Sequence, residues 1–381
     1  MSREYVNIYK FIELCNSGVK KFDGSKTYIS TGDSDDLENG EIVTYKNRPS
    51  RANVIAKPGD ILIAKMSKTE KTILIDNITA ANIYSTGFYC LNSRVMHNKY
   101  LYYLLSNYEF NMEKDSWSFG TTQISLNENN FKKIKIHIEN DLSKQEKIQT
   151  LLDKKVDFLN LLISNQQQQI EKLKEYKQSL IREVVTKGLD PNVEFKESGI
   201  EWVGLIAKKS KLIQLKRLAR INNGKEIRNV DGDIPVYGSG GIFKYTDEYL
   251  YEGESILYGR KGTIDKPLHV SGKFWTVDTM FYTEISKLVL PRYLYYISVG
   301  SINFDYYKSG SVLPSMTQFE LGNVLMPVFD IKSQIEIVKY LDHKTNMIDR
   351  LIELKYTKIN NIEEYKKSLI YEYVTGKKEV S

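Results

Sequence analysis

The sequence is poor in the residues that build disulfide scaffolds, metal centres and membrane spans. Its 381 residues include only two cysteines, Cys15 and Cys90, with no CxxC pair, and four histidines without HExxH or similar spacing. We therefore expect neither a disulfide framework nor a zinc site, and a reducing cytoplasm is the natural compartment. No window approaches the roughly 18 uninterrupted apolar residues of a membrane span. The N-terminal MSREYVNIYKFIEL lacks the cationic head and apolar run of a signal peptide.

Motifs for catalysis are also missing. The sequence contains no Walker A motif, and no glycine-rich S-adenosylmethionine loop followed by an Asn-Pro-Pro-aromatic motif. GSGG at 238–241 precedes strand-like sequence and not a helix, which favours a tight turn over a phosphate cradle. Asp190 with Glu194 and Lys196 could be arranged as a nuclease motif, but their closeness in a linker favours a solvated loop. We therefore expect a chain that performs no chemistry itself, and that binds no cofactor.

The remaining composition is that of a folded protein. Hydrophobic residues make up 41% and charged residues 27% of the chain, which excludes the disordered class. The length predicts two or three domains. A net charge of +6 permits a nucleic-acid partner without requiring one. The 27 tyrosines serve cores, interfaces and nucleic-acid surfaces equally well, so they decide nothing.

An internal repeat is the strongest feature of the sequence. EYKQSLIREVVT at 175–186 returns as EYKKSLIYEYVT at 364–375, at a constant offset of 189 residues and without a gap. The match extends upstream, so that 145–186 aligns with 334–375. Neither copy contains Pro or Gly before its end, and a Gly follows each one, as is typical of helix ends. We expect two helices of about forty residues, each roughly 60 Å long.

The apolar residues of both copies recur at alternating steps of three and four, which is a coiled-coil period. Two-fold symmetry between the copies predicts that the helices pair antiparallel. Polar residues interrupt the two seams at equivalent places. The expected seams are Leu159, Ile163, Gln166, Ile170, Leu173, Lys177, Leu180 and Val184, and Ile348, Ile352, Lys355, Ile359, Ile362, Lys366, Leu369 and Tyr373.

Each long helix follows a segment of short Val-, Ile-, Tyr- and Phe-rich runs broken by Gly, Pro, Asn and Asp. Such runs predict strands and turns, and DILIA at 60–64, FKKIKIHI at 131–138 and ESILYG at 254–259 are examples. KYLYYLLS at 99–106 and RYLYYISV at 292–299 read as short amphipathic helices. The predicted fold is α+β, with two mixed α/β domains at 1–142 and 206–332, long helices at 143–187 and 333–376, and a linker at 188–205.

The order globular–helix–globular–helix resembles the DNA specificity subunit of a type I restriction–modification system. The two EYKxSLIxExVT endings, the connector TKGLDPNVEFKESGIEWVG at 186–204 and YGSGGIF at 237–243 carry the resemblance, which covers essentially the whole chain. It implies two target-recognition domains that each read one half of a split, asymmetric DNA sequence. It also implies that the paired helices set the spacer and dock two methyltransferase subunits, with nuclease–translocase subunits joining the full complex. S-adenosylmethionine, ATP and Mg²⁺ are then expected on partner subunits.

Loops with cations, Gly and small hydroxyl or tyrosine side chains are the candidates for DNA contact, because cations hold phosphates and polar side chains read base edges. GRKGT at 259–263 and RPSR at 48–51 are the preferred motifs. The alternative for each residue is an ordinary solvated surface charge. The candidates are Lys46, Arg48, Arg51, Lys65, Lys68, Thr121, Thr122 and Gln123 in the first domain, and Tyr237, Ser239, Lys244, Arg260, Lys261, Thr263, Lys308 and Ser311 in the second.

The seam lysines Lys177 and Lys366 allow two interpretations. They are either register-setting residues inside the helix pair or edge residues with buried stems and free ammonium groups. The edge position is favoured, because the seam supplies no obvious partner for a buried lysine. The neighbouring Tyr176 and Tyr365 serve either packing or the methyltransferase interface.

Two other functions remain open. A coiled-coil scaffold that tethers two protein-binding domains would share this organisation but would select no DNA sequence. A self-sufficient restriction enzyme is disfavoured by the missing motifs.

Overall fold

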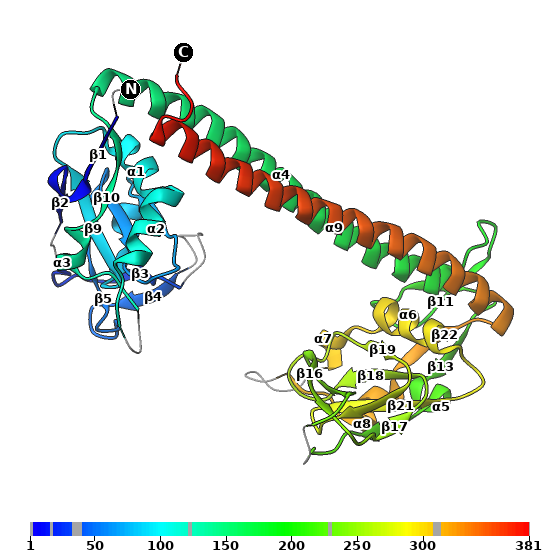
Figure 1. The fold of residues 1–381 in the computed structure, drawn as a ribbon. Helices are drawn as coiled ribbons and strands as arrows, with labels where there is room; N and C mark the ends of the chain where they lie inside the picture. The colour runs from blue at the N-terminus through cyan, green and yellow to red at the C-terminus, as the bar shows by residue number, and fades with distance from the viewer. Residues whose placement is uncertain are drawn as a thin grey trace. The chain divides into compact units, whose positions relative to one another are not determined.

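The computed structural model describes residues 3–15, 18–32, 40–120, 124–227, 231–307 and 314–380. The chain divides into two compact units, one formed by residues 1–166 and 357–381 and the other by residues 167–356. Each unit contains one sheet-rich region and parts of the two long helices, α4 (Leu142–Lys187) and α9 (Ile331–Thr375) (Figure 1). Among the described residues, no helix combines the length and apolar character needed to cross a membrane.

The first unit contains two four-stranded sheets, with strand orders β2-β9-β6-β7 and β4-β3-β8-β5, and a β1–β10 pair. The strands are β1 (Arg3–Asn7), β2 (Ile12–Leu14), β3 (Ser25–Ile29), β4 (Glu41–Thr44), β5 (Ala52–Val54), β6 (Ile61–Ala64), β7 (Thr72–Leu74), β8 (Ile83–Ser85), β9 (Phe88–Ser93) and β10 (Lys135–Glu139). The helices are α1 (Asn98–Ser106), α2 (Tyr108–Ser116) and α3 (Glu128–Phe131).

The second unit repeats this plan, with sheet orders β14-β21-β18-β19 and β16-β15-β20-β17 and a β13–β22 pair. The strands are β13 (Lys211–Gln214), β14 (Ala219–Asn223), β15 (Ile234–Gly238), β16 (Gly241–Thr246), β17 (Tyr251–Glu252), β18 (Ser255–Gly259), β19 (Leu268–Val270), β20 (Lys273–Thr276), β21 (Met280–Ile285) and β22 (Leu325–Val328). The helices are α5 (Leu215–Leu218), α6 (Pro291–Ser301), α7 (Phe304–Tyr307) and α8 (Gln318–Asn323).

The strands and short helices expected from the sequence are present, with one shifted boundary. β6 is buried along its whole length, as the apolar run DILIA predicts. The strand expected at 131–138 begins only at Lys135. Asn127, the residue before the short helix α3, caps that helix by accepting a hydrogen bond from the Asn130 amide, and Phe131 is the last residue of α3. Figure 1 shows α1 and α6 in their respective units. Each helix buries two of its three tyrosines and all of its leucines.

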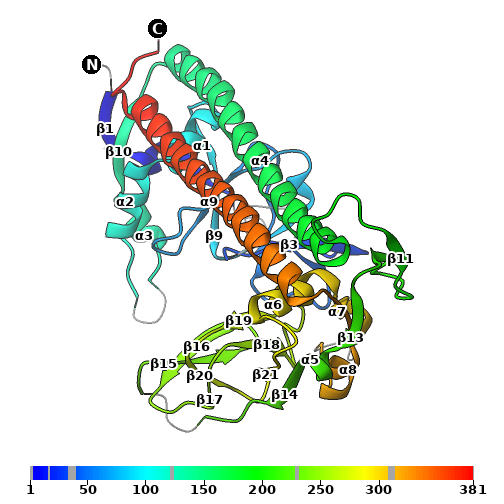
Figure 2. The same ribbon diagram turned by 90° about the vertical axis from the view of Figure 1, so that its right-hand side faces the viewer.

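The two long helices lie side by side and run antiparallel, as expected (Figures 1 and 2). In the second unit, Lys177 contacts Asp349, and Gln169, two turns earlier in α4, contacts Lys355, later in α9. In the first unit, Asn160 of α4 contacts Lys366 of α9. Every residue of both predicted seams is buried or partly buried. The left-handed Gly188 (φ 80°) and Gly376 (φ 78°) follow the two helix ends.

Each sheet-rich region is tied to a long helix by the same side chains. Gln145 at the start of α4 accepts from the His97 amide (3.2 Å) and donates to the Glu139 carbonyl (2.7 Å). Gln334 at the start of α9 accepts from the Leu290 amide (2.8 Å) and donates to the Phe329 carbonyl (2.8 Å). These glutamines therefore hold the first turn of each long helix against the domain that precedes it in the chain.

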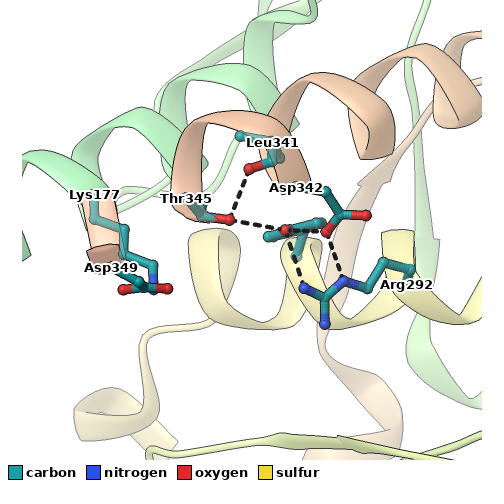
Figure 3. Close-up of polar contacts among 7 residues, drawn as sticks. Lys177, Arg292, Leu341, Asp342, Thr345 and Asp349 are labelled. Carbon is teal, nitrogen blue, oxygen red and sulfur yellow. Dashed lines mark hydrogen bonds and ion pairs between the residues drawn. The ribbon is translucent and has the colours of Figure 1, made fainter. Parts of the chain in front are cut away.

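A second matched tie lies two turns further along each helix. Asp153 accepts from Lys99 and from the Tyr103 hydroxyl, both at 2.8 Å. Asp342 accepts from Arg292 at 2.8 Å and from the Tyr296 hydroxyl at 2.5 Å (Figure 3). The matched segments at 99–106 and 292–299 therefore present one cation and one tyrosine to the helix.

The connector after α4 contains its own small hairpin. β11 (Phe195–Glu197) pairs antiparallel with β12 (Leu205–Ala207). Trp202, between these strands, donates to the Ser301 carbonyl, and its ring centroid lies 4.5 Å from that of Tyr306 in a tilted contact. The connector is therefore packed on the second domain. The domain limits expected from the sequence stay a prediction.

Candidate nucleic-acid interface

The GRKGT segment forms a tight loop at the end of β18. The Arg260 amide donates to the Thr279 carbonyl (2.8 Å), and the Gly262 amide donates to the Pro314 carbonyl (2.9 Å). A Cβ on Gly259 would lie 2.1 Å from the Thr263 carbonyl oxygen, and Gly262 has a φ of 83°. Glycine is thus required twice by the backbone path. The loop holds the Arg260 and Lys261 side chains at the surface beside residues 314–316.

The first domain builds the equivalent loop from different residues. The Leu126 amide donates to the Lys65 carbonyl (2.8 Å), just as the Met316 amide donates to the Arg260 carbonyl (3.0 Å). Lys65 and Arg260 therefore occupy the same place. Lys68, in the left-handed region at φ 61°, is held there because its amide donates to Asp115 (2.9 Å). In both loops hydrogen bonds within the domain fix the backbone, but the side chains that the loops carry differ.

Three further candidates of the second domain, Tyr237, Ser239 and Lys244, lie on β15, on β16 and in the turn between them. GSGG forms the tight turn between these strands, with Gly238 paired to Gly241, as predicted. Ser239 in the turn lies next to Gly262, since its hydroxyl would be 3.0 Å from a Cβ there. Lys244 is exposed on β16. Burial raises the pKa of Tyr237, whose ring packs against Phe274. The structure thus brings Ser239 and the GRKGT loop together.

Two of the cationic candidates of the first domain already form hydrogen bonds within the domain. Lys65 donates to the Thr86 carbonyl (2.8 Å) and lies 4.4 Å from the centroid of the Tyr89 ring, and burial lowers its pKa. Arg48 donates to the Ala52 carbonyl within its own turn. Lys46, Arg51 and Lys68 are exposed. Thr121, Thr122, Gln123, Lys308 and Ser311 lie outside the described residues. None of these positions establishes a DNA contact, so the whole set stays a prediction.

The helix-pair candidates have partners that sequence reasoning missed. Lys177 donates to both carboxylate oxygens of Asp349 (2.7 and 2.6 Å), and Lys366 donates to the Asn160 amide oxygen (3.0 Å). Both lysines are partly exposed, so they lie at the edge of the seam with their ammonium groups bound rather than free. Tyr176 and Tyr365 are 57% and 54% exposed. Packing within the chain therefore covers just under half of each tyrosine, and their role in packing or in the methyltransferase interface stays a prediction.

Two weak chemical patterns can be placed. Lys196 donates to the carbonyls of Lys208 and Ser210, while Glu194 pairs with Lys208. These contacts are structural. Within the described residues, one group with metal-ligand chemistry comes together, formed by Cys15, Asp60 and Cys90. The Asp60 carboxylate there accepts from Asn92 (2.7 Å) and the Lys57 amide (2.8 Å), which is how a buried carboxylate is satisfied without an ion.

Sequence reasoning also missed a set of polar side chains beside the GRKGT loop. Asn222 and Asn223 end β14, and Gln318 and Phe319 begin α8. The Thr317–Glu320 capping box is visible in the sequence as TQFE and could have located this helix start. Its meeting with β14 joins segments 95 residues apart, which no local pattern predicts.

Comparison with known proteins agrees with this architecture. A family model described as the type I restriction modification DNA specificity domain matches residues 10–172 and 208–364. A candidate type I restriction enzyme specificity subunit of Haemophilus influenzae is 29% identical over 125 residues, which is 32% of each chain. The MjaVIII specificity subunit of Methanocaldococcus jannaschii is 25% identical over 321 residues, covering 75% of this chain and 71% of that one. Thus the alignment with the Haemophilus relative spans only about a third of its length.

A solved chain from a type I R-M system, described for its complex assembly and conformational transition, has the same fold. The two structures align over 98% of each chain with a TM-score of 0.69 at 14% identity. This likeness confirms the predicted α+β architecture with two mixed domains and two long helices. The family match covers both globular regions and most of both helices. The chain therefore belongs to the family of type I restriction–modification DNA specificity domains and carries that domain twice.

Proposed function

We propose that this chain is the DNA sequence-recognition subunit of a type I restriction–modification complex. Each globular domain reads one half of a split, asymmetric target, and the helix pair sets the spacer between the halves. The chain selects the site and positions partners that carry out the chemistry. The same proposal places it in the cytoplasm with its DNA.

One observation carries this proposal. The side chains that join each domain to its helix are matched, as in Gln145 and Gln334, or Asp153 and Asp342. The loops at the equivalent surface are built alike but carry different residues, with Lys65 where the other domain has Arg260. A matched frame with divergent loops is what two readers of different sequences require, since base edges are distinguished by side-chain chemistry.

The repeated helix ends support two equivalent docking sites for methyltransferase subunits. Tyr176 and Tyr365 stand at matched positions and are both about half exposed. Tyrosine is enriched at protein interfaces, because a rigid ring and a polar hydroxyl are buried together at low entropic cost. S-adenosylmethionine, ATP and Mg²⁺ belong to the methyltransferase and restriction–translocase subunits in this proposal, and this chain needs no cofactor of its own.

A genome-wide map of methylated adenines, made in the host with and without this gene, tests the proposal. Loss of one split motif on deletion is the expected result, and it would reveal both half-sites and the spacer. Persistence of every methylated motif, together with failure to co-purify with a methyltransferase, would favour the coiled-coil scaffold that binds proteins and reads no DNA.

A further inference from the structure

A groove lined by both polar and apolar residues runs between β14 and α8 in the second unit. It has a volume of about 790 Å³, and it adjoins a hollow of about 350 Å³ that reaches Arg260 and Lys261. Both are lined by Asn223, Thr317 and Gln318, so the groove continues into the GRKGT loop. None of these β14 and α8 residues was among the sequence candidates. The groove therefore extends the candidate interface to a new surface.

Side-chain amides line the groove, and two of them are hydrogen-bonded to each other. Gln318 donates to the Ile221 carbonyl at 2.8 Å and accepts from Asn223 at 3.4 Å. The Asn222 amide donates to the Glu284 carboxylate at 2.8 Å and so gives one of its oxygens a hydrogen-bond partner. An amide has two N–H groups and two oxygen lone pairs. Gln318 and Asn223 therefore keep hydrogen-bonding capacity for a ligand in the groove.

The edges of the groove supply positive charge and one exposed ring. Lys216 and Arg220 are both exposed, and Lys216 donates to Asn323 at 2.7 Å. Phe319 is 79% exposed at the first turn of α8, whose start is fixed by the Thr317–Glu320 capping box. Cations suit phosphates, amides suit base edges, and an apolar ring suits a thymine methyl group.

The first domain has a different surface at the same place. The Ile8 amide donates to the Ile134 carbonyl, just as the Leu215 amide donates to the Val324 carbonyl, so Ile8 and Leu215 are equivalent positions. Counting along the chain from them, Tyr9 corresponds to Lys216, and Glu13 corresponds to Arg220. Glu128, the first residue of α3, corresponds to Gln318. It accepts from the Tyr9 hydroxyl and pairs with Lys132, both at 3.0 Å. The fold itself does not demand the amides and cations of the second domain, so a function specific to that domain accounts for them.

We propose that Gln318 and Asn223 determine base specificity in the half-site read by the second domain, with Lys216 and Arg220 on the flanking phosphates. The chemistry of these side chains favours adenine, because a Gln or Asn amide matches the donor and acceptor that adenine presents in the major groove. This inference rests on the proposed function and adds the residues that carry it out.

The test uses the complex of this chain with its methyltransferase subunits and a DNA library with both half-sites randomised. Methylated molecules are sequenced. Gln318→Ala should reduce base discrimination at one position of one half-site by roughly 5- to 150-fold, the value of one bidentate base contact. Gln318→Glu should shift that position towards cytosine, since a carboxylate accepts from the cytosine amino group. A purely structural glutamine would not produce this shift.

Two further variants guard against misfolding and misassignment. Phe319→Ala removes an exposed ring, so it should leave thermal unfolding unchanged while weakening selection in the same half-site. Asn129→Ala, on α3 of the first domain, is the control. It should leave base selection in the half-site read by the second domain unchanged. Unchanged base preferences in both Gln318 variants would overturn the inference while the proposed function stands. A wild-type complex that selects no split site would defeat both.

Discussion

Lys177 donates hydrogen bonds to both carboxylate oxygens of Asp349, at 2.7 and 2.6 Å (Figure 3). At the matched positions of the repeat, Lys366 donates to the amide oxygen of Asn160 at 3.0 Å. The same lysine therefore has a charged partner in one unit and a neutral partner in the other. The two halves of the helix pair differ in this contact by one carboxylate.

Replacing Asn160 by Asp should restore the missing ion pair. We expect the free energy of unfolding to rise by about 0.5 kcal/mol, since exposed ion pairs contribute little. The gain should shrink at high salt, because the pair is open to screening. Urea denaturation at two ionic strengths measures it. The control is Asn160→Asp made in a Lys366→Ala background. An equal gain in the free energy of unfolding there would mean that another group, and not Lys366, pairs with the new carboxylate.

Removing the carboxylate of Asp342 should loosen the second domain from α9. Asp342→Ala leaves Arg292 and the Tyr296 hydroxyl without their acceptor. We expect a loss of about 1.5–3 kcal/mol in the free energy of unfolding, the range for hydrogen bonds to a charged group. Asp349→Ala is the comparison, because the Asp349 side chain is 52% exposed and the Asp342 side chain 37%. Equal losses for the two variants would contradict the anchoring role.

Alkaline pH should weaken the same anchor. Burial, followed by the hydrogen bond to Asp342, raises the pKa of Tyr296 from 10.0 to about 12. The raised pKa means that the stabilisation is complete below pH 10 and is lost as the pH rises towards 12. Urea denaturation at pH 9 and pH 11 checks this. Tyr296→Phe should show a smaller drop between the two pH values, and an undiminished drop would assign the effect to other tyrosines.

The two cysteines should differ in reactivity although they are neighbours. A hydrogen bond from the Cys90 thiol lowers the pKa of Cys15, whereas the pKa of Cys90 is raised by its hydrogen bond with Cys15 and by burial. The thiolate is the reactive form. Iodoacetamide followed by mass spectrometry should label Cys15 first, and Cys90 only after unfolding. Labelling of both at one rate would show that the pair is not held as described.

The helices could be predicted in detail and the groove could not. The seam from Leu159 to Val184 follows from a local period, and the Gly188 stop is adjacent in sequence. Lys177 and Asp349 are 172 residues apart, and their meeting depends on the helix register. Sequence symmetry gave the antiparallel direction but no partner for the lysine, so its pairing was missed.

The same limit applies to the site. The GRKGT loop could be named as a candidate because its glycines and cations are consecutive. Asn223 and Gln318 meet only when β14 is placed beside α8, and each alone looks like an ordinary surface amide. Strand pairing brings them together through contacts of long sequence separation, which composition and periodicity do not encode.

The matched ties at Gln145 and Gln334, and at Asp153 and Asp342, give each domain a joint of the same chemistry. A coding segment that ends within the joints could therefore be replaced without redesigning the helices. Under the proposed function, such an exchange would alter one half of the target and leave the other half intact. A population of cells could thus acquire new specificities by recombination, one half-site at a time.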